Sequence, residues 1–599
     1  MKIQELLFPV IGRCTETELY YRTNSDERAD IDRSKPAIVF EKNAKVDFDT
    51  YFNGFYIEKW SKYTILNNLS LKLLLSGRFK VILMTKELIH EDVIEKIVNE
   101  SVIDSQDVQE YVFTYDNADA KKGMYTFALE SLQEGSRFYG GSYCSEVPAE
   151  KIRKVKIGIG ICTFRREAFI EKNLRILKES ILENTDSVMY DRLEVFIADN
   201  GQTLDREKLS GEKIHINPNR NLGGAGGFTR DLIEILKHND DLKITHVLLM
   251  DDDIVIEPEA LVRTYTILSL LKDEYIDAFV GGAMLRLDQQ YIQVESGACW
   301  NGGQLVSLKN NLDLTLSENC LFNEVEEYRE FNAWWFCCFP VSVVREDNLP
   351  LPIFIRGDDL EYGLRNMKHL ILTNGICVWH EPFENKYSSF LEYYITRNQL
   401  IDNSFHCQWF GTKQLAHDIL LHTMQELMYY RYRNMDIYLR GIKDFLKGPK
   451  WLMEQDGETL HKEIMAAGYK GQELETLDMP FRYSVYQASF DVNCSKARWW
   501  FNFLTFNGLL LKAKGENIVS MSACRTVQFY RMKRVMHYDI TSNKAFITQK
   551  SIGKTFRYLF QAFGLLCLLP FKLKKAQRAY RTEGMKLRTL TFWEQYLGM

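Results

Sequence analysis

Between residues 156 and 253, short apolar runs alternate with amphipathic stretches, and this alternation constrains the fold more than any other feature of the sequence. The stretch at 167–183 has the pattern of a helix, and four apolar runs have the length of buried strands: 156–162, 193–198, 214–217 and 245–250. Strand, helix and strand in this order predict βαβ units with parallel strands. We therefore expect an α/β domain here.

The last of these runs ends directly in Asp251, Asp252 and Asp253. Their repulsion is more easily tolerated where a divalent cation neutralises it. Residues two apart in extended backbone point to the same side, so Asp251 and Asp253 are the natural ligand pair, with Asp252 turned toward a ribose or the backbone. The apolar run 376–380 ends in His380, which becomes a third ligand if the fold brings it to the aspartates. A solvated acidic turn and a structural histidine explain the same residues without a ligand.

A glycine-rich segment, NLGGAGGF at 221–228, precedes the helix pattern that extends to residue 238. Glycines permit conformations and close approaches that a Cβ would block. The segment is neither a Walker loop nor the GxGxxG fingerprint, which argues against a nucleotide-dependent dehydrogenase. A tight strand-to-helix connection whose glycines contact no ligand is the alternative to a binding role.

Two further pairs could belong to a site. Trp334 and Trp335 are adjacent, and such tryptophans are usually core or interface residues, although their faces also stack on sugars. Asp358 and Asp359 stand at a predicted helix start. Neighbouring like charges raise the pKa of a carboxylate, which suits a general base, whereas an N-cap role also explains Asp358.

The flanking regions differ in pattern from this α/β stretch. Residues 1–150 carry short strand-like runs typical of an antiparallel β-sandwich, and we give a domain without ligand and a sugar-binding or acceptor-guiding domain equal weight. Residues 401–599 contain long aromatic and cationic helical stretches. The expected domains are therefore 1–150, 151–400 and 401–599.

Composition excludes several classes of protein. With 75 Lys and Arg against 81 Asp and Glu, the net charge is −6, and no basic stretch interleaved with aromatics in the first 500 residues indicates nucleic acid as a partner. The 12 cysteines lack CxxC spacing and the N-terminus lacks the features of a signal peptide, so we expect reduced thiols in the cytoplasm.

The C-terminal tail has two interpretations. Its longest uncharged stretch, 558–571, is 14 residues long and falls short of the roughly 20 needed for a membrane-spanning helix. The last 49 residues hold nine Lys or Arg and two Glu. Such a tail could contact an anionic membrane surface peripherally, or it could be a buried helix with a solvated basic face.

In order, the motifs TFRR at 163–166, DN at 199–200, NLGG at 221–224, DDD at 251–253, WW at 334–335, DDLE at 358–361 and WH at 379–380 resemble inverting GT-A glycosyltransferases of family 2. Together with FDTYFN at 48–53 and YYITRN at 393–398, they resemble the galactofuranosyltransferases that build cell-wall galactan. The resemblance covers residues 30 to 400 well and the helical C-terminal part by position only.

The resemblance implies a Rossmann-like GT-A catalytic domain of the α/β class, an N-terminal β-sandwich and a mainly α-helical C-terminal domain. Asp359 would be the catalytic base. The metal, Mn²⁺ or Mg²⁺, would be held by Asp251, Asp253 and His380. The nucleotide-sugar site would comprise Thr163, Arg165, Arg166, Asp199, Asn221, Asp252, Trp335 and Asp358, and the acceptor site Glu295, Trp300 and Trp334.

The implied reaction transfers galactofuranose from UDP-galactofuranose to a hydroxyl of a bacterial surface glycan, by metal-assisted single displacement with inversion. The acceptor would be lipid-linked and the enzyme would act at the cytoplasmic face of the membrane, with a homo-oligomer as a further expectation. The alternatives are a GT-A transferase for another sugar, such as rhamnose or glucose, and a catalytically silent carbohydrate-binding protein.

Overall fold

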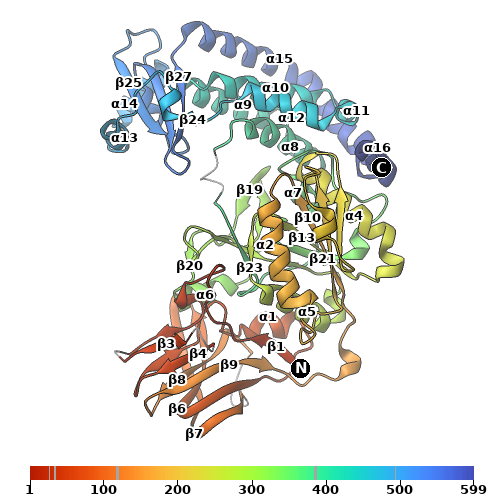
Figure 1. Cartoon of the computed structure of the whole chain (residues 1–599). Coiled ribbons are helices and arrows are strands. Elements are labelled where there is room, and N and C mark those ends of the chain that lie inside the picture. Colours follow the sequence, from red (N-terminus) through yellow and green to blue (C-terminus); the bar gives the residue numbers. More distant parts are fainter. Residues whose placement is uncertain (26, 33–35, 116–120, 383–386, 493) are drawn as a thin grey trace.

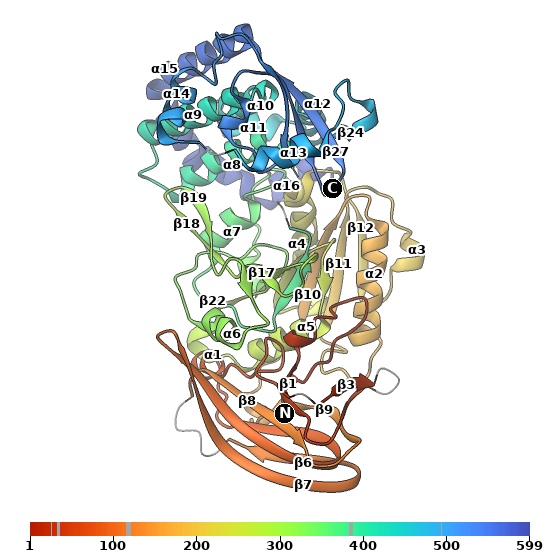
Figure 2. The ribbon, with the colours of Figure 1, turned by 90° about the vertical axis from the view of Figure 1, so that its left-hand side faces the viewer.

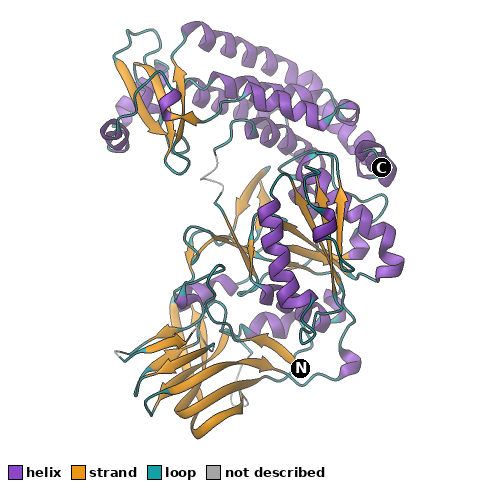
Figure 3. Ribbon diagram, viewed as in Figure 1, coloured by secondary structure: helices purple, strands orange, loops and turns teal. Residues whose placement is uncertain are grey.

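The computed structural model describes the chain except for residues 26, 33–35, 116–120, 383–386 and 493. An N-terminal β-sheet region, a mixed α/β region and a C-terminal helical region are stacked along the molecule (Figures 1 and 3). The end of the chain leaves this order, because α16 (Leu590–Leu597) lies beside α4 (Gly223–Leu242) of the middle region.

The N-terminal region is one antiparallel sheet that branches. Its order is β2 (Arg22–Thr23), β5 (Lys45–Asp47), β8 (Met124–Ser131), β6 (Ser70–Ile89), β9 (Ser136–Cys144), β4 (Ala37–Phe40) and β3 (Ala29–Asp32), with β1 (Lys2–Glu5) on β9 and β7 (Asp92–Thr114) on β6. The long strand β6 pairs with β9 along its first part and with β8 further on (Figure 2). The two branches pack through Phe127 and Phe138, whose ring centroids are 6.3 Å apart. A β-rich region is thus confirmed, and its strands belong to one hydrogen-bonded sheet, so the β-sandwich expected from the sequence stays a prediction.

The FDTYFN segment lies in the core and supports the middle region. Phe52 is fully buried, and its ring centroid is 5.9 Å from that of Trp379, the neighbour of His380. From α1 (Ile57–Tyr63), the buried Lys59 places its Nζ 3.0 Å from Oε2 of Glu324. The N-terminal region therefore packs against the strand that ends in His380.

The middle region contains the predicted parallel strands. The order of its main sheet is β12 (Ile214–Pro218), β11 (Leu193–Asp199), β10 (Ile157–Thr163), β13 (His246–Asp251), β21 (Cys337–Pro340), β15 (Phe279–Gly281) and β22 (Leu370–Ile371). The first four strands are mutually parallel, and β21 is antiparallel to both of its neighbours. The predicted helix after β10 is α2 (Glu167–Leu177). These elements agree with the sequence pattern because the central strands β10, β11 and β13 are mostly apolar and almost entirely buried.

A second sheet brings His380 to the aspartates. Its order is β14 (Val255–Ile256), β23 (Cys377–His380), β16 (Ala283–Arg286), β17 (Ile292–Glu295) and β20 (Leu312–Asp313), and the hairpin of β18 (Ala298–Asn301) and β19 (Gln304–Ser307) follows β17. Strand β14 comes directly after the turn that contains the aspartates and pairs antiparallel with β23. The remaining helices of this region are α3 (Arg206–Leu209), α5 (Pro258–Leu270), α6 (Ser317–Glu324) and α7 (Asp358–Asn366).

The glycine-rich segment differs from the predicted turn, because α4 begins at Gly223 and includes the glycines in its first two turns. Gly223 has a φ of +72°, and a Cβ there would lie 2.1 Å from the carbonyl oxygen of Phe354. A Cβ on Gly227 would lie 2.1 Å from Sγ of Cys162. The glycines thus allow close packing of α4 against two other segments, and whether they also contact a ligand stays a prediction.

The C-terminal region is mainly helical, as predicted, with α8 (Leu391–His406), α9 (Thr412–Met428), α10 (Tyr432–Leu446), α11 (Pro449–Glu454), α12 (Gly457–Ala467), α13 (Tyr483–Phe490), α14 (Lys496–Leu504), α15 (Ile552–Thr582) and α16. It also contains a sheet in the order β24 (Gln472–Glu473), β27 (Lys544–Gln549), β26 (Met532–Asp539) and β25 (Gly515–Ser520), which the sequence analysis did not predict. Helix α8 runs without a break through residue 400, where a domain limit was predicted.

Helix α15 packs one face on α8, α9 and α10 and exposes the other. The buried face includes Leu565, Leu569 and Leu573. Within the described part of the chain, one helical segment, 552–588, is long and apolar enough to cross a membrane by length and composition. Core helices pass the same test, so this is weak support for a span. Beyond α15 the chain returns to the middle region, where Nε1 of the buried Trp593 donates to the carbonyl oxygen of Pro350 at 2.9 Å.

Candidate active site

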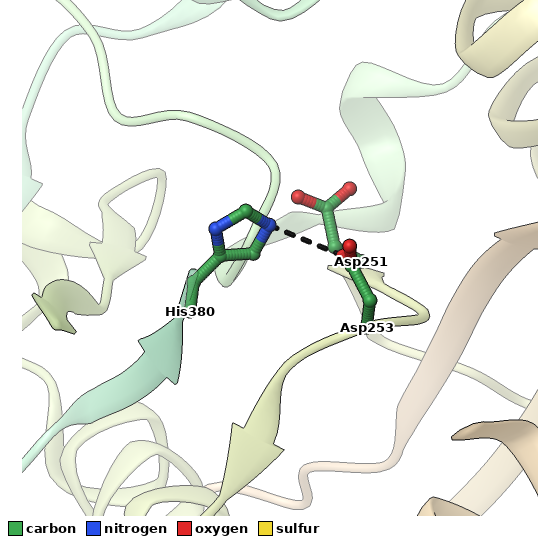
Figure 4. A group of neighbouring side chains, drawn as sticks. All are labelled: Asp251, Asp253 and His380. Atoms are coloured by element: carbon green, nitrogen blue, oxygen red, sulfur yellow. Dashed lines mark hydrogen bonds and ion pairs between the residues drawn. The ribbon is translucent and has the colours of Figure 1, made fainter. Parts of the chain in front are cut away.

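Three side chains that could hold a metal ion meet at the carboxyl edge of the main sheet. Asp251 ends β13, Asp253 follows in the next turn and His380 ends β23, and one ligand atom from each lies within 4.8 Å of the other two (Figure 4). Nε2 of His380 is 3.1 Å from Oδ1 of Asp253. Nδ1 of His380 donates to the carbonyl oxygen of Glu381 at 2.7 Å, which leaves Nε2 as the nitrogen that faces the aspartates.

The electrostatics of this triad suit a cation. Burial raises the pKa of Asp251 to about 7, and the charges of Asp253 and Asp252 add to the increase. Burial alone would lower the pKa of His380, but its hydrogen bond to Asp253 and the nearby carboxylates raise it. Two carboxylates and one imidazole are oxygen and nitrogen donors of the kind that Mn²⁺ and Mg²⁺ sites contain. A divalent cation would reduce the repulsion between the two half-buried carboxylates.

Asp252 is anchored by two residues of the TFRR motif. Thr163, the last residue of β10, donates from Oγ1 to Oδ2 of Asp252 at 2.7 Å. Nη1 of Arg166 donates to Oδ1 of Asp252 at 2.7 Å and lies 2.8 Å from Oδ2 of Asp253. Arg165 has a φ of +56° and lies over the ring of Phe164 instead. Arg166 is therefore the arginine of the pair that contacts the acidic cluster.

Asp199 and Asn221 lie at the same edge of the sheet and hold turns. Asp199 is opposite Thr163 in the parallel pairing of β11 with β10. Its Oδ1 accepts from the backbone N–H of Gly201 at 3.1 Å and its Oδ2 from that of Leu204 at 2.9 Å. Oδ1 of Asn221 accepts from the N–H of Gly223 at 3.2 Å. Their predicted contacts with a nucleotide stay predictions.

The first turn of α7 carries the two aspartates of the DDLE motif. Burial raises the pKa of Asp358 to about 8, with further contributions from the charges of Asp359 and Asp251. Burial also raises the pKa of Asp359, whose Oδ1 accepts from the N–H of Leu360 at 2.7 Å. Asp358 is buried, whereas Asp359 is half-buried. Of the two, Asp359 is more open to a substrate.

The adjacent tryptophans are packed in the protein interior. Trp334 is 4% exposed and meets the rings of Phe228 and Tyr362 edge-on, at centroid distances of 5.3 and 5.8 Å. Trp335 is 5% exposed and donates from Nε1 to the carbonyl oxygen of Gly282 at 2.8 Å. Trp334 therefore helps to join α4 to α7, and the predicted sugar contacts of both tryptophans stay predictions.

Glu295 ends β17, and Trp300 lies in the hairpin that follows it. Burial raises the pKa of Glu295 to about 7, a hydrogen bond with Ser307 opposes the increase and the charge of Asp359 adds to it. Oε1 of Glu295 has no hydrogen-bond partner among the residues that the structure describes. Trp300, on β18, donates from Nε1 to Oδ1 of Asn403 in α8 at 2.9 Å. Their predicted role in acceptor binding stays a prediction.

Sequence reasoning missed two side chains that support the site. Nδ2 of Asn173, in α2, donates to the backbone oxygen of Asp252 at 2.9 Å. Asn398, in α8, donates to three carbonyl oxygens of the segment that leads into Asp358. The YYITRN motif contained a signal for Asn398 but carried no assigned role, and nothing in the sequence singled out Asn173.

Known proteins resemble this chain in sequence. Residues 3–129 match the family described as Galactofuranosyltransferase 2 N-terminal. The galactofuranosyltransferase GlfT2 of Mycolicibacterium smegmatis is 27% identical over 442 residues, which are 68% of this chain and 65% of that protein. GlfT2 of Mycobacterium tuberculosis is 27% identical over 447 residues, which are 68% of this chain and 66% of that protein. The resemblance to galactofuranosyltransferases is confirmed.

The chain thus spans just under two thirds of the length of these galactofuranosyltransferases. Among solved structures, the mannosyltransferase PcManGT from Pyrobaculum calidifontis in complex with GDP-Man and Mn²⁺ overlaps 43% of this chain and 65% of its own, with 13% identity and a TM-score of 0.28. This overlap is too small to support a conclusion.

Proposed function

We propose that this protein is an inverting galactofuranosyltransferase that transfers galactofuranose from UDP-galactofuranose to a hydroxyl of a bacterial surface glycan. The observation that carries the proposal is the meeting of Asp251, Asp253 and His380 with the Asp358–Asp359 pair at one edge of the sheet. Sugar binding alone requires no such combination of ligands and a base. The similarity to the two GlfT2 proteins supports the choice of donor.

The residues of the site would have two kinds of role, in binding the charged donor and in transferring a proton. Asp251, Asp253 and His380 would hold Mn²⁺ or Mg²⁺, which when bound neutralises charge on a diphosphate. Thr163, Asp199 and Asn221 would position the nucleotide, and Arg166 would add a positive charge beside it.

Asp359 would take the proton from the acceptor hydroxyl as that oxygen forms its bond to C1 of the sugar. The bond from C1 to the UDP oxygen breaks in the same step, and UDP leaves with the bonding electron pair. A single displacement of this kind converts an α-linked donor into a β-linked product. The raised pKa of Asp359 makes it a stronger base than a solvated aspartate.

The test is a donor panel with Mn²⁺ and a galactan-like acceptor. We expect UDP release and a longer glycan only with UDP-galactofuranose, a loss of at least about 100-fold in turnover for Asp359→Asn, and no turnover after chelation. Asp277→Asn, which removes only a surface pair with Lys368, should leave turnover unchanged. Turnover with a rhamnose or glucose donor instead would refute galactofuranose as the donor, and glycan binding without any turnover would favour the binding protein.

We further propose that the acceptor is lipid-linked and that α15 contacts the cytoplasmic face of the membrane peripherally. Phe560, Phe563 and Phe571 share its outer face and are 73, 65 and 81% exposed. The same helix carries seven Lys or Arg and no Asp or Glu. Exposed aromatic rings beside cationic side chains suit an interface of anionic lipids.

This contact is tested with the triple variant Phe560→Ser, Phe563→Ser, Phe571→Ser and vesicles that contain an anionic lipid. Vesicle binding should be weaker for the variant than for the wild type. Binding by the wild type should also be weaker at high salt than at low salt. The matched control, Ile94→Ser, Ile97→Ser, Val102→Ser, removes apolar residues of β7 that are 50, 52 and 58% exposed, and it should bind like the wild type. Equal binding by all three proteins would contradict a role of α15.

A further inference from the structure

Residues 353–357, which lead into the two aspartates of α7, hold a backbone conformation that needs support. Phe354 has a φ of +74°, Arg356 of +67° and Gly357 of +95°. Side chains other than glycine rarely adopt the left-handed region, so Phe354 and Arg356 do not favour this path by themselves. Contacts from elsewhere in the molecule must stabilise it.

Asn398 of α8 supplies most of these contacts. Its Nδ2 lies 3.1 Å from the carbonyl oxygen of Ile353, 2.9 Å from that of Ile355 and 2.7 Å from that of Arg356. An amide has two N–H groups, so they are shared among three acceptors. One buried side chain therefore ties together the whole segment.

Arg397 orients this amide. Nε of Arg397 donates to Oδ1 of Asn398 at 2.9 Å, which turns the NH₂ group toward the carbonyl oxygens. Nη2 of Arg397 donates to the carbonyl oxygen of Ile353 at 2.7 Å. The remaining carbonyl, that of Phe354, accepts from the N–H of Ala225 in α4 at 3.2 Å. Every carbonyl from 353 to 356 thus has a donor from outside the segment.

The same helix also packs closely against Gly357. A Cβ on Gly357 would lie 2.7 Å from Oδ2 of Asp402, one turn after Asn398 in α8. The carbonyl oxygen of Gly357 accepts from the N–H of Glu361 at 2.8 Å, so the first turn of α7 begins where the supported segment ends. The position of this turn depends on α8.

We propose that Asn398, oriented by Arg397, is a positioning residue for Asp359. It holds residues 353–357, of which Phe354, Arg356 and Gly357 are left-handed, and so sets where the first turn of α7 presents the Asp359 carboxylate. The kinetic part of this proposal rests on the proposed function, in which Asp359 accepts the proton. Asn398 itself contacts neither substrate nor metal ligand in this scheme.

The experiment compares Asn398→Ala with Asn434→Ala. Asn434 is an equally buried amide in α10, bonded to Tyr387 and Glu426 away from the site. We expect hydrogen exchange in peptides that cover 351–362 to be faster in Asn398→Ala than in the wild type and unchanged in Asn434→Ala. We also expect kcat to fall about 100-fold in Asn398→Ala with KM for the donor unchanged, because displacement of a catalytic group by about 1 Å has an effect of this size.

Arg397→Lys is a milder variant for the case that Asn398→Ala does not fold. It keeps a cation but loses the Nε donor to Asn398, so we expect the same pattern with a smaller loss of kcat. Unchanged exchange at 351–362, or equal loss of activity in Asn434→Ala, would overturn the proposal. If the wild type shows no turnover, the proposed function fails, and the exchange measurement still decides whether Asn398 holds the segment.

Discussion

Glu295 is a site residue at which burial opposes ionisation. It is 6% exposed, and its Oε1 has no hydrogen-bond partner in the described part of the chain. Burial raises the pKa of Glu295 from 4.5 to about 7. A hydrogen bond with Ser307 opposes this increase, and the charge of Asp359 adds to it. In the folded protein, the neutral form of Glu295 is thus favoured below about pH 7.

This shift predicts a pH-dependent effect of Glu295→Gln. A folded pKa above the unfolded value adds stability that is fully present below about 4.5 and is lost as the pH rises through 7. Glutamine cannot ionise, so the variant should be more stable than the wild type by about 3 kcal/mol at pH 8 and by less than about 1 kcal/mol at pH 5. Denaturant unfolding at the two pH values measures this. The exposed Glu274→Gln should show no difference at either pH, and a pH-independent effect of Glu295→Gln would contradict the prediction.

At the scale of elements, helix α4 shows that neighbouring glycines can differ in the space around them. Its first turns contain four glycines. Gly227 faces Cys162 of β10 closely, whereas Gly224 faces Asp358 at a greater distance. A Cβ on Gly224 would have its nearest neighbour at 3.8 Å, an ordinary contact. The sequence pattern alone does not distinguish these two glycines.

We therefore predict opposite outcomes for two matched substitutions in α4. Gly227→Ala should lower the free energy of unfolding by roughly 1–3 kcal/mol, because the Cβ would overlap the Cys162 side chain. Gly224→Ala should be neutral or stabilising by up to about 1 kcal/mol, since alanine favours the helix. Thermal and denaturant unfolding measure both. Equal destabilisation by the two would show that packing against β10 is not the reason for the glycines.

At the scale of the whole molecule, the C-terminus closes on the helix that carries the catalytic candidates. Oε1 of the fully buried Glu361, in α7, accepts from Nη2 of Arg588 at 2.8 Å, and its Oε2 accepts from Nη2 of Arg365 at 2.9 Å. Burial opposes ionisation, but Arg365, His406 and Arg588 lower the pKa of Glu361 to about 2. Burial also lowers the pKa of Arg588 to about 10, which reflects the desolvation of the pair.

Removal of one partner of the buried pair of Glu361 and Arg588 should therefore destabilise the protein strongly. We predict that Arg588→Ala lowers the free energy of unfolding by about 3–5 kcal/mol, because Glu361 loses a buried cation, whereas the exposed Lys586→Ala changes it by less than about 0.5 kcal/mol. The contribution of Glu361 is present above pH 4.5 and is lost as the pH falls toward 2, so the difference should shrink in acid. Denaturant unfolding at pH 7 and pH 3 tests both points, and a loss that does not depend on pH would contradict them.

The sequence by itself determined the elements and motifs whose signals are local. The parallel strands of the middle region, the helix α2 and the acidic residues after β13 follow from short runs of neighbouring residues. The resemblance to galactofuranosyltransferases rested on such motifs and was confirmed.

Only the tertiary structure decided which side chains meet. It placed Arg166 rather than Arg165 on the acidic cluster, assigned the glycines to the first turns of α4, brought Asn398 to the segment before α7 and carried Arg588 to Glu361. It also revealed the small C-terminal sheet, whose short strands lie among helices. The contacts of Arg166, Asn398 and Arg588 join residues 86, 42 and 227 positions apart along the chain. No periodicity or composition encodes such pairings, because they depend on how whole elements pack.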